Sequence, residues 1–102
     1  MQPEEATHRK EDQYPINRKL LLRDQETGEL KPLFAGVGLP IALGDGRDFG
    51  CEVYISQGIL KPTMIYGLDA LQATSLAMGM IDKLLQRAQD SGDLYWSSGE
   101  QY

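Results

Sequence analysis

The sequence changes its hydrophobic period at Asp69. Before that residue, apolar side chains tend to recur at every second position, which is the period of a β-strand with one buried face. After it, small and apolar side chains recur at intervals of three and four, the period of an α-helix, at Ala70, Ala73, Thr74, Ala77, Met78, Ile81, Leu84, Leu85 and Ala88. Hairpins followed by one long amphipathic helix are typical of an α+β domain. We therefore predict an antiparallel sheet with a long C-terminal helix packed across one face.

Four strands are predicted before the helix, in the order β-β-β-β-α. Polar, glycine-containing stretches separate them and have the chemistry of tight turns. Gly36, Gly38 and Pro40 interrupt the second strand, so we expect it to bend, because glycine in a strand marks a bulge or a close backbone approach. The predicted strands cover residues 15–23, 30–42, 49–56 and 59–67, and residues 93–96 follow the helix as a short extended piece.

The third strand shows the two-residue alternation most clearly. Its residues divide into an apolar set, Phe49, Cys51, Val53 and Ile55, and a more polar set, Gly50, Glu52, Tyr54 and Ser56. This division predicts a sheet with one face against the helix and one face in water. Cys51 belongs to the apolar set, so we expect a core cysteine rather than a nucleophile, since apolar burial raises the pKa of a thiol.

The ends of the helix carry recognisable signals. Asp69 and Gln72 have the spacing of a capping box, in which the aspartate caps the first turn and the glutamine reaches back. Ser91 and Gly92 are typical of a helix end, with glycine in the left-handed conformation after the last turn.

Composition limits the classes of function. The 102 residues carry a net charge of -5, which disfavours binding to nucleic acid. No segment has the length or hydropathy of a membrane helix or a signal peptide, so a cytoplasmic protein is predicted. One cysteine and one histidine, His8, are too few for a disulfide or a typical zinc site, and no cofactor or metal is expected. Residues 1–13 are predicted to be a disordered tail, and residues 14–102 a single domain.

The segment from Phe49 to Trp96 resembles a small bacterial domain family of unknown function. The resemblance rests on a strand with a cysteine, a glycine turn, a Tyr-Gly-Leu-Asp-Ala-Leu-Gln opening of the helix and a tryptophan after the helix. The matching residues are Cys51, Gly58, Tyr66, Gly67, Leu68, Asp69, Ala70, Leu71, Gln72, Ala73 and Trp96. The resemblance implies the same fold, and it implies no activity and no catalytic residue.

Two groups of residues are candidates for a functional site. The first is an interaction surface on the wet face and the aromatic C-terminus, made of Glu52, Tyr54, Ser56, Tyr95 and Trp96. The second is a pocket near the start of the helix, with Tyr66 and Asp69 at its mouth. The pocket hypothesis requires that the Asp69 carboxylate face a cavity instead of capping the helix.

Three functions remain open. The favoured hypothesis is a noncatalytic protein-interaction module, in the extended version an immunity-type inhibitor of a basic partner, because the chain is acidic and lacks an acid-base or nucleophile constellation. The alternative is a small-ligand-binding domain or minor enzyme with the pocket at Tyr66 and Asp69. The third is a homodimer, because the helix carries additional apolar residues beside its main stripe, namely Leu71, Leu76 and Met80.

Overall fold

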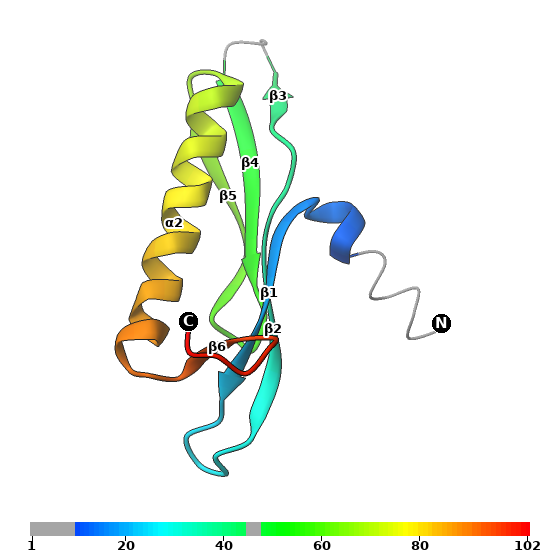
Figure 1. The fold of residues 1–102 in the computed structure, drawn as a ribbon. Coiled ribbons are helices and arrows are strands. Elements are labelled where there is room, and N and C mark those ends of the chain that lie inside the picture. The colour runs from blue at the N-terminus through cyan, green and yellow to red at the C-terminus, as the bar shows by residue number, and fades with distance from the viewer. Residues whose placement is uncertain (1–9, 45–47) are drawn as a thin grey trace.

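An antiparallel sheet with one long helix across one face forms the domain (Figure 1). The computed structural model describes residues 10–44 and 48–102. The elements are β1 (Ile16–Arg23), β2 (Leu30–Val37), β3 (Ile41–Leu43), β4 (Asp48–Ile55), β5 (Leu60–Gly67), α2 (Ala70–Asp90) and β6 (Leu94–Trp96). Strand β4 pairs with β5 on one side and with both β2 and β3 on the other, and β1 pairs with β2 and β6. The predicted α+β class and the antiparallel sheet are confirmed.

The predicted bent second strand is two strands. β2 ends at Val37 and β3 begins at Ile41, and both pair with β4. Between them, the Gly38 N–H donates to the Glu52 carbonyl oxygen at 2.8 Å, so the connection stays beside β4. A Cβ atom at Gly38 would lie 3.2 Å from the Gln13 carbonyl oxygen, which identifies the break as a close backbone approach.

The predicted extended piece after the helix is a sixth strand. β6 pairs with β1, so that Leu94 lies opposite Leu22 and Trp96 opposite Leu20. The Leu94 side chain is completely buried in the core, and the Tyr102 N–H donates to its carbonyl oxygen at 2.9 Å. The prediction of four strands was therefore wrong in number, because a short edge strand and a broken strand leave little periodicity in the sequence.

Helix α2 packs mainly over β4 and β5 (Figure 1). Ala73, Ala77, Ile81 and Leu85 of the predicted stripe are buried, which confirms its central register. Met78 remains 46% exposed, because it lies on the flank of α2 that faces β1 and β2, where the helix leaves the sheet less covered. The apolar stripe is thus wider than the contact that the sheet provides.

The chain before β1 crosses to the sheet face opposite α2, called the back face below. Residues 10–13, which belong to the segment predicted as a disordered tail, are helical, and Tyr14 after them is buried. Residues 1–9, with His8, lie outside the described residues, and so do residues 45–47 of the turn before β4. The described N-terminal segment therefore adds a layer on the back face.

Candidate functional site

An aromatic cluster lies at the centre of the back face. The Tyr14 ring stacks on the Tyr54 ring with centroids 5.4 Å apart, and it meets the edge of the Phe34 ring at 6.2 Å. A Cβ atom at Gly36 would lie 2.5 Å from the Tyr14 Cβ, so the missing side chain of Gly36 leaves the space that Tyr14 fills. The prediction of a water-exposed face was wrong here, because Tyr14 covers the strands that carry the polar set.

The Tyr14 side chain also forms a hydrogen bond with Glu52, an acidic residue beside the aromatic cluster. Its hydroxyl donates to Glu52 Oε2 at 2.9 Å, and Lys10 Nζ lies 5.4 Å from the centre of the Tyr54 ring. Burial raises the pKa of the Tyr14 hydroxyl well above its usual value, and the neighbouring Glu52 carboxylate raises that pKa further. The hydroxyl therefore stays protonated and acts as a hydrogen-bond donor that fixes the N-terminal segment.

The predicted interaction surface divides into two separate parts. Glu52 and Tyr54 share the back face, but both already contact the N-terminal segment. Ser56 lies nearby, and its Oγ accepts a hydrogen bond from the Phe34 N–H at 2.8 Å, a structural role within the sheet. Tyr95 and Trp96 belong to β6, at the edge of the sheet, and strands β2 and β1 lie between β6 and β4.

Arginine side chains cover the aromatic residues of the C-terminus. The Arg23 guanidinium lies 5.0 Å from the centre of the Tyr95 ring, and the Arg18 guanidinium lies 5.6 Å from the centres of both the Trp96 and Tyr102 rings. The Trp96 and Tyr102 rings are 4.9 Å apart. These contacts hold the C-terminus against β1, and they account for Arg18, which the strand pattern places on the apolar side.

Most of the large, strongly exposed apolar side chains lie at the end of the domain that carries β3. In register, Ile41 lies opposite Gly50, and Gly50 lies opposite Tyr66, so these residues share the back face. The Met64 side chain covers Gly50, where a Cβ atom would lie 2.7 Å from the Met64 sulfur. We call Ile41, Leu43, Met64, Tyr66 and Leu68 the β3-end patch.

Exposure and shape distinguish the β3-end patch from ordinary surface. Ile41, Tyr66 and Leu68 are 50%, 62% and 73% exposed. A shallow hollow of about 500 Å³ connects Leu43, Tyr66 and Leu68, and it is also lined by Asp48, Gly67 and Gln72. Clustered exposed apolar side chains mark contact sites more often than scattered ones do.

Asp69 caps the helix instead of facing that hollow. Its Oδ1 accepts a hydrogen bond from the Gln72 N–H at 2.7 Å. The Gln72 side chain reaches back as predicted, but Oε1 accepts from the Leu68 N–H at 2.6 Å, one residue before the capping-box position. The pocket hypothesis therefore loses its candidate acid, and Tyr66 remains as an exposed aromatic on the β3-end patch.

A larger hollow, of about 530 Å³, opens elsewhere on the back face, between the N-terminal segment and β2. Leu21, Pro32 and Phe34 are among its apolar lining residues, and Lys10, Glu11 and Lys19 contribute charged groups. Lys19 forms an ion pair with Glu11 across it. Sequence reasoning missed this hollow, because it depends on where the chain before β1 lies.

Cys51 is fully buried, as predicted. Its Sγ donates to the Gly38 carbonyl oxygen at 3.0 Å, and burial raises the pKa of the thiol. Within residues 10–44 and 48–102, no group of histidine, cysteine, aspartate and glutamate side chains has the arrangement of a metal site. In the same ranges, no helix has the length and hydropathy needed to span a membrane.

The apolar helix residues of the homodimer hypothesis do not form one surface. At about 100° per residue, Leu71 lies roughly 140° to 180° around α2 from Leu76 and Met80. Leu71 therefore belongs to the flank with Met78, and the other two belong to the opposite flank, beside β5. A contact on one flank of α2 therefore leaves at least one of the three uncovered.

No family model, no curated protein and no solved structure matches the chain. The resemblance of Phe49–Trp96 to a bacterial family of unknown function therefore stays a prediction.

Proposed function

We propose that the protein is a noncatalytic interaction module that binds another protein through the β3-end patch. The observation that carries this proposal is the concentration of exposed apolar side chains on one end of the back face, around Ile41, Tyr66 and Leu68. Large apolar side chains that are this exposed present apolar surface to water. Burial of that surface by a partner contributes favourable binding free energy.

The charged neighbours of the patch indicate the chemistry of the partner. Among the described residues, the charged side chains that adjoin it in sequence or register are acidic. Asp48 lines the same hollow as Tyr66, Glu52 lies opposite Met64, and Asp69 follows Leu68 in the chain. An apolar centre with an acidic rim suits a partner with a basic rim, because complementary charge accelerates association. This supports the narrower proposal of an immunity-type inhibitor of a basic protein.

The test is a pull-down from a lysate of the native host with matched bait proteins. The wild-type chain is compared with Leu68→Ser on the patch and with Leu30→Ser, which changes an exposed leucine at the far end of β2. Captured proteins are quantified by mass spectrometry at low and high salt. We expect one basic protein that the wild type and Leu30→Ser retain equally, that Leu68→Ser loses, and that high salt weakens.

Two outcomes would count against the proposal. Equal capture of the same proteins by the wild type and Leu68→Ser would exclude the β3-end patch as the contact. Capture of nothing above bead background would exclude a stable partner, and it would favour the alternative of a small-ligand-binding domain. For that alternative the back-face hollow beside Phe34 replaces the pocket at Tyr66 and Asp69 as the place to look.

A further inference from the structure

Strand β5 leaves one edge of the sheet open. Among the described residues, its only strand partner is β4, and α2 packs over the face of the sheet rather than beside this edge (Figure 1). Lys61 and Pro62 protect the first part of the strand, since charge and proline disfavour strand pairing. The stretch from Thr63 to Gly67 has no such protection. Its outward backbone groups can therefore hydrogen-bond to an added strand.

A flank of α2 forms a wall beside this open edge. Leu76 and Met80 are 50% and 36% exposed, and they lie about 40° apart around the helix. Met78 and Asp82 line a hollow with β1 and β2, so the flank with Leu76 and Met80 is the one on the β5 side. Ile65 pairs with the buried Cys51 and hence faces α2. An added strand would place alternate side chains against this apolar part of the wall.

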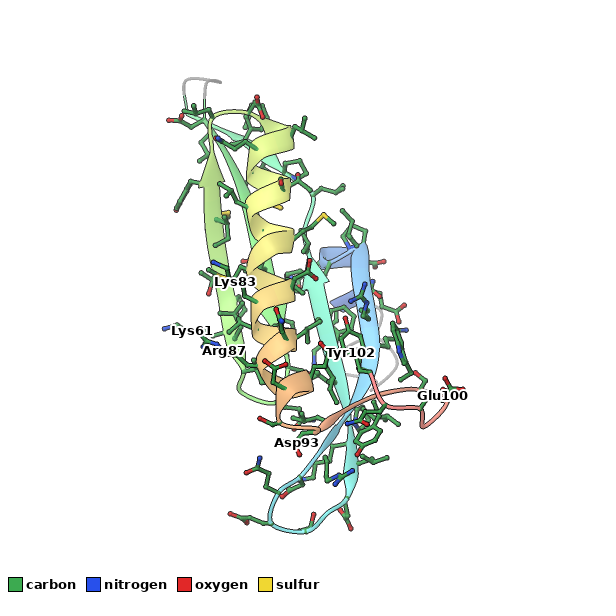
Figure 2. The ribbon with its side chains drawn as sticks, turned by 60° about the vertical axis from the view of Figure 1, so that its left-hand side comes forward. Lys61, Lys83, Arg87, Asp93, Glu100 and Tyr102 are labelled. Atoms are coloured by element: carbon green, nitrogen blue, oxygen red, sulfur yellow. The ribbon has the colours of Figure 1, made fainter. Side chains whose placement is uncertain are left out.

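The lower part of the same wall is basic. Figure 2 shows Lys61, Lys83 and Arg87 on the β5 side of α2. Lys83 and Arg87 are one helical turn apart, and Lys61 lies in β5 just beyond the register shift that separates it from Thr63. The two ion pairs between described residues involve other groups. Three cations therefore gather on one flank of a chain whose net charge is -5. We call the unprotected part of β5 with this flank the β5–α2 edge.

A second copy of the chain does not match this arrangement. In a two-fold antiparallel pairing of β5 with β5, the Lys61 end of one copy would lie against the Tyr66 end of the other. The cations would then face the apolar residues Leu76 and Met80, and neither group would find a complementary partner. The required occupant has an apolar part and an acidic part in fixed order.

We propose that the β5–α2 edge binds an extended segment of another protein, which adds to the sheet antiparallel to β5. From its N-terminal end, the segment carries alternate apolar side chains next to Leu76 and Met80 and then acidic side chains next to Lys83 and Arg87. Backbone hydrogen bonds to β5 supply part of the affinity, and the apolar-then-acidic order supplies the specificity. The edge shares the backbone of Met64 and Tyr66 with the β3-end patch, but the side chains of these two residues lie on the back face, whereas the added segment contacts α2 on the other face. The two proposals are therefore tested by different variants.

The probe is a capped, fluorescein-labelled heptapeptide. Its first and third residues are valine, its fifth and seventh are glutamate, and threonine fills the remaining positions. Fluorescence polarisation measures its binding to the full chain, and backbone amide chemical shifts show where it binds. We expect saturable binding, with the largest shift changes at residues 63–67 and on the α2 flank with Leu76 and Met80. A peptide with N-methylated alternate amides on the pairing edge should not bind, because it cannot form the ladder.

Charge variants test the basic part of the wall. Lys83→Gln combined with Arg87→Gln should weaken binding of the acidic peptide about fivefold, from two exposed ion pairs. Ser75→Glu combined with Gln86→Glu is the matched control, since it changes the net charge equally on the part of α2 that points away from the sheet. This control and Leu68→Ser on the β3-end patch should bind the peptide as the wild type does.

Several results would overturn the proposal. Absence of binding at millimolar peptide, equal binding of a peptide with lysine in place of glutamate, or shift changes confined to the back face would each exclude the acidic segment. Sedimentation showing a dimer whose dissociation on dilution changes the amide shifts of residues 63–67 would make a second copy the occupant. We expect a monomer at micromolar concentration.

Discussion

Replacing Gly67 with alanine should destabilise the domain by about 1–3 kcal/mol, which is the usual cost of overpacking. A Cβ atom at Gly67 would lie 2.5 Å from the Ala73 backbone nitrogen, 2.8 Å from its Cα and 3.1 Å from its Cβ. These atoms belong to the first turn of α2, which Asp69 caps. A rigid capped turn cannot rotate away as a long side chain can, so the helix or β5 must shift.

Gly79→Ala is the matched control, because it adds the same methyl group to a place with no neighbour. Gly79 lies inside α2, and outside the helix's own backbone nothing lies within 4 Å of a Cβ built on it. Only the helix propensity changes there, and alanine should stabilise the domain by about 1 kcal/mol. Both variants add one methyl group, and we expect them to change the unfolding free energy in opposite directions.

Urea unfolding, followed by circular dichroism, measures both variants. For a domain near this size, about 1 kcal/mol corresponds to a change of roughly 4–8 °C in Tm, so thermal unfolding gives a second reading. The urea slopes should stay equal, since neither variant changes the surface that unfolding exposes. If Gly67→Ala is as stable as the wild type while Gly79→Ala gains stability, the close approach of α2 to β5 is refuted.

Three further predictions use the same unfolding assay. Asp69→Ala should cost about 1 kcal/mol, because the Gln72 N–H loses its acceptor, and Asp69→Asn should retain most of that stability; equal loss in both would contradict the cap. Tyr14→Phe should cost about 1–2 kcal/mol by removing the hydrogen bond to Glu52, and a wild-type value would show that the N-terminal segment does not close on the back face. The pKa of Cys51 is raised in the folded state, so the unfolded thiol ionises first and the unfolding free energy should fall as pH rises past about 9.0; Cys51→Ala should lack this part of the decline.

The helix could be predicted from the sequence because its signals are local and agree with each other. The stripe through Ala73, Ala77, Ile81 and Leu85 identifies the buried face, and Asp69 and Gly92 identify the two ends. Gly92 has a φ of 76°, the left-handed conformation expected there. Propensity, pattern and capping all favour one structure, which is the condition under which sequence reasoning succeeds.

The sites could not be predicted as well, because they depend on contacts between distant segments. Tyr14 covers the back face from 38 residues before Glu52 in the chain, and a strand pattern contains no information on such a contact. Periodicity marked Leu76 and Met80 as unusual, but only the sheet order shows that an open strand edge lies beside them. The signal for Tyr14 was Gly36, whose interruption of the strand indicated a close approach without identifying the residue that approaches.

Glycines in the sheet explain why the back face differs from the predicted water-exposed surface. Gly36 is filled by Tyr14 and Gly50 by Met64, in each case with atoms nearer than 3.0 Å to a Cβ position. Both glycines belong to the set of positions that alternation assigns to water. A glycine there removes the side chain that would keep neighbours away, and an aromatic or thioether side chain covers the backbone instead. Glycine at these two positions therefore removes a polar side chain from the back face and lets an apolar side chain pack there. Tyr66 lies opposite Gly50 and, with its exposed neighbours, belongs to an apolar surface of the kind that protein partners cover.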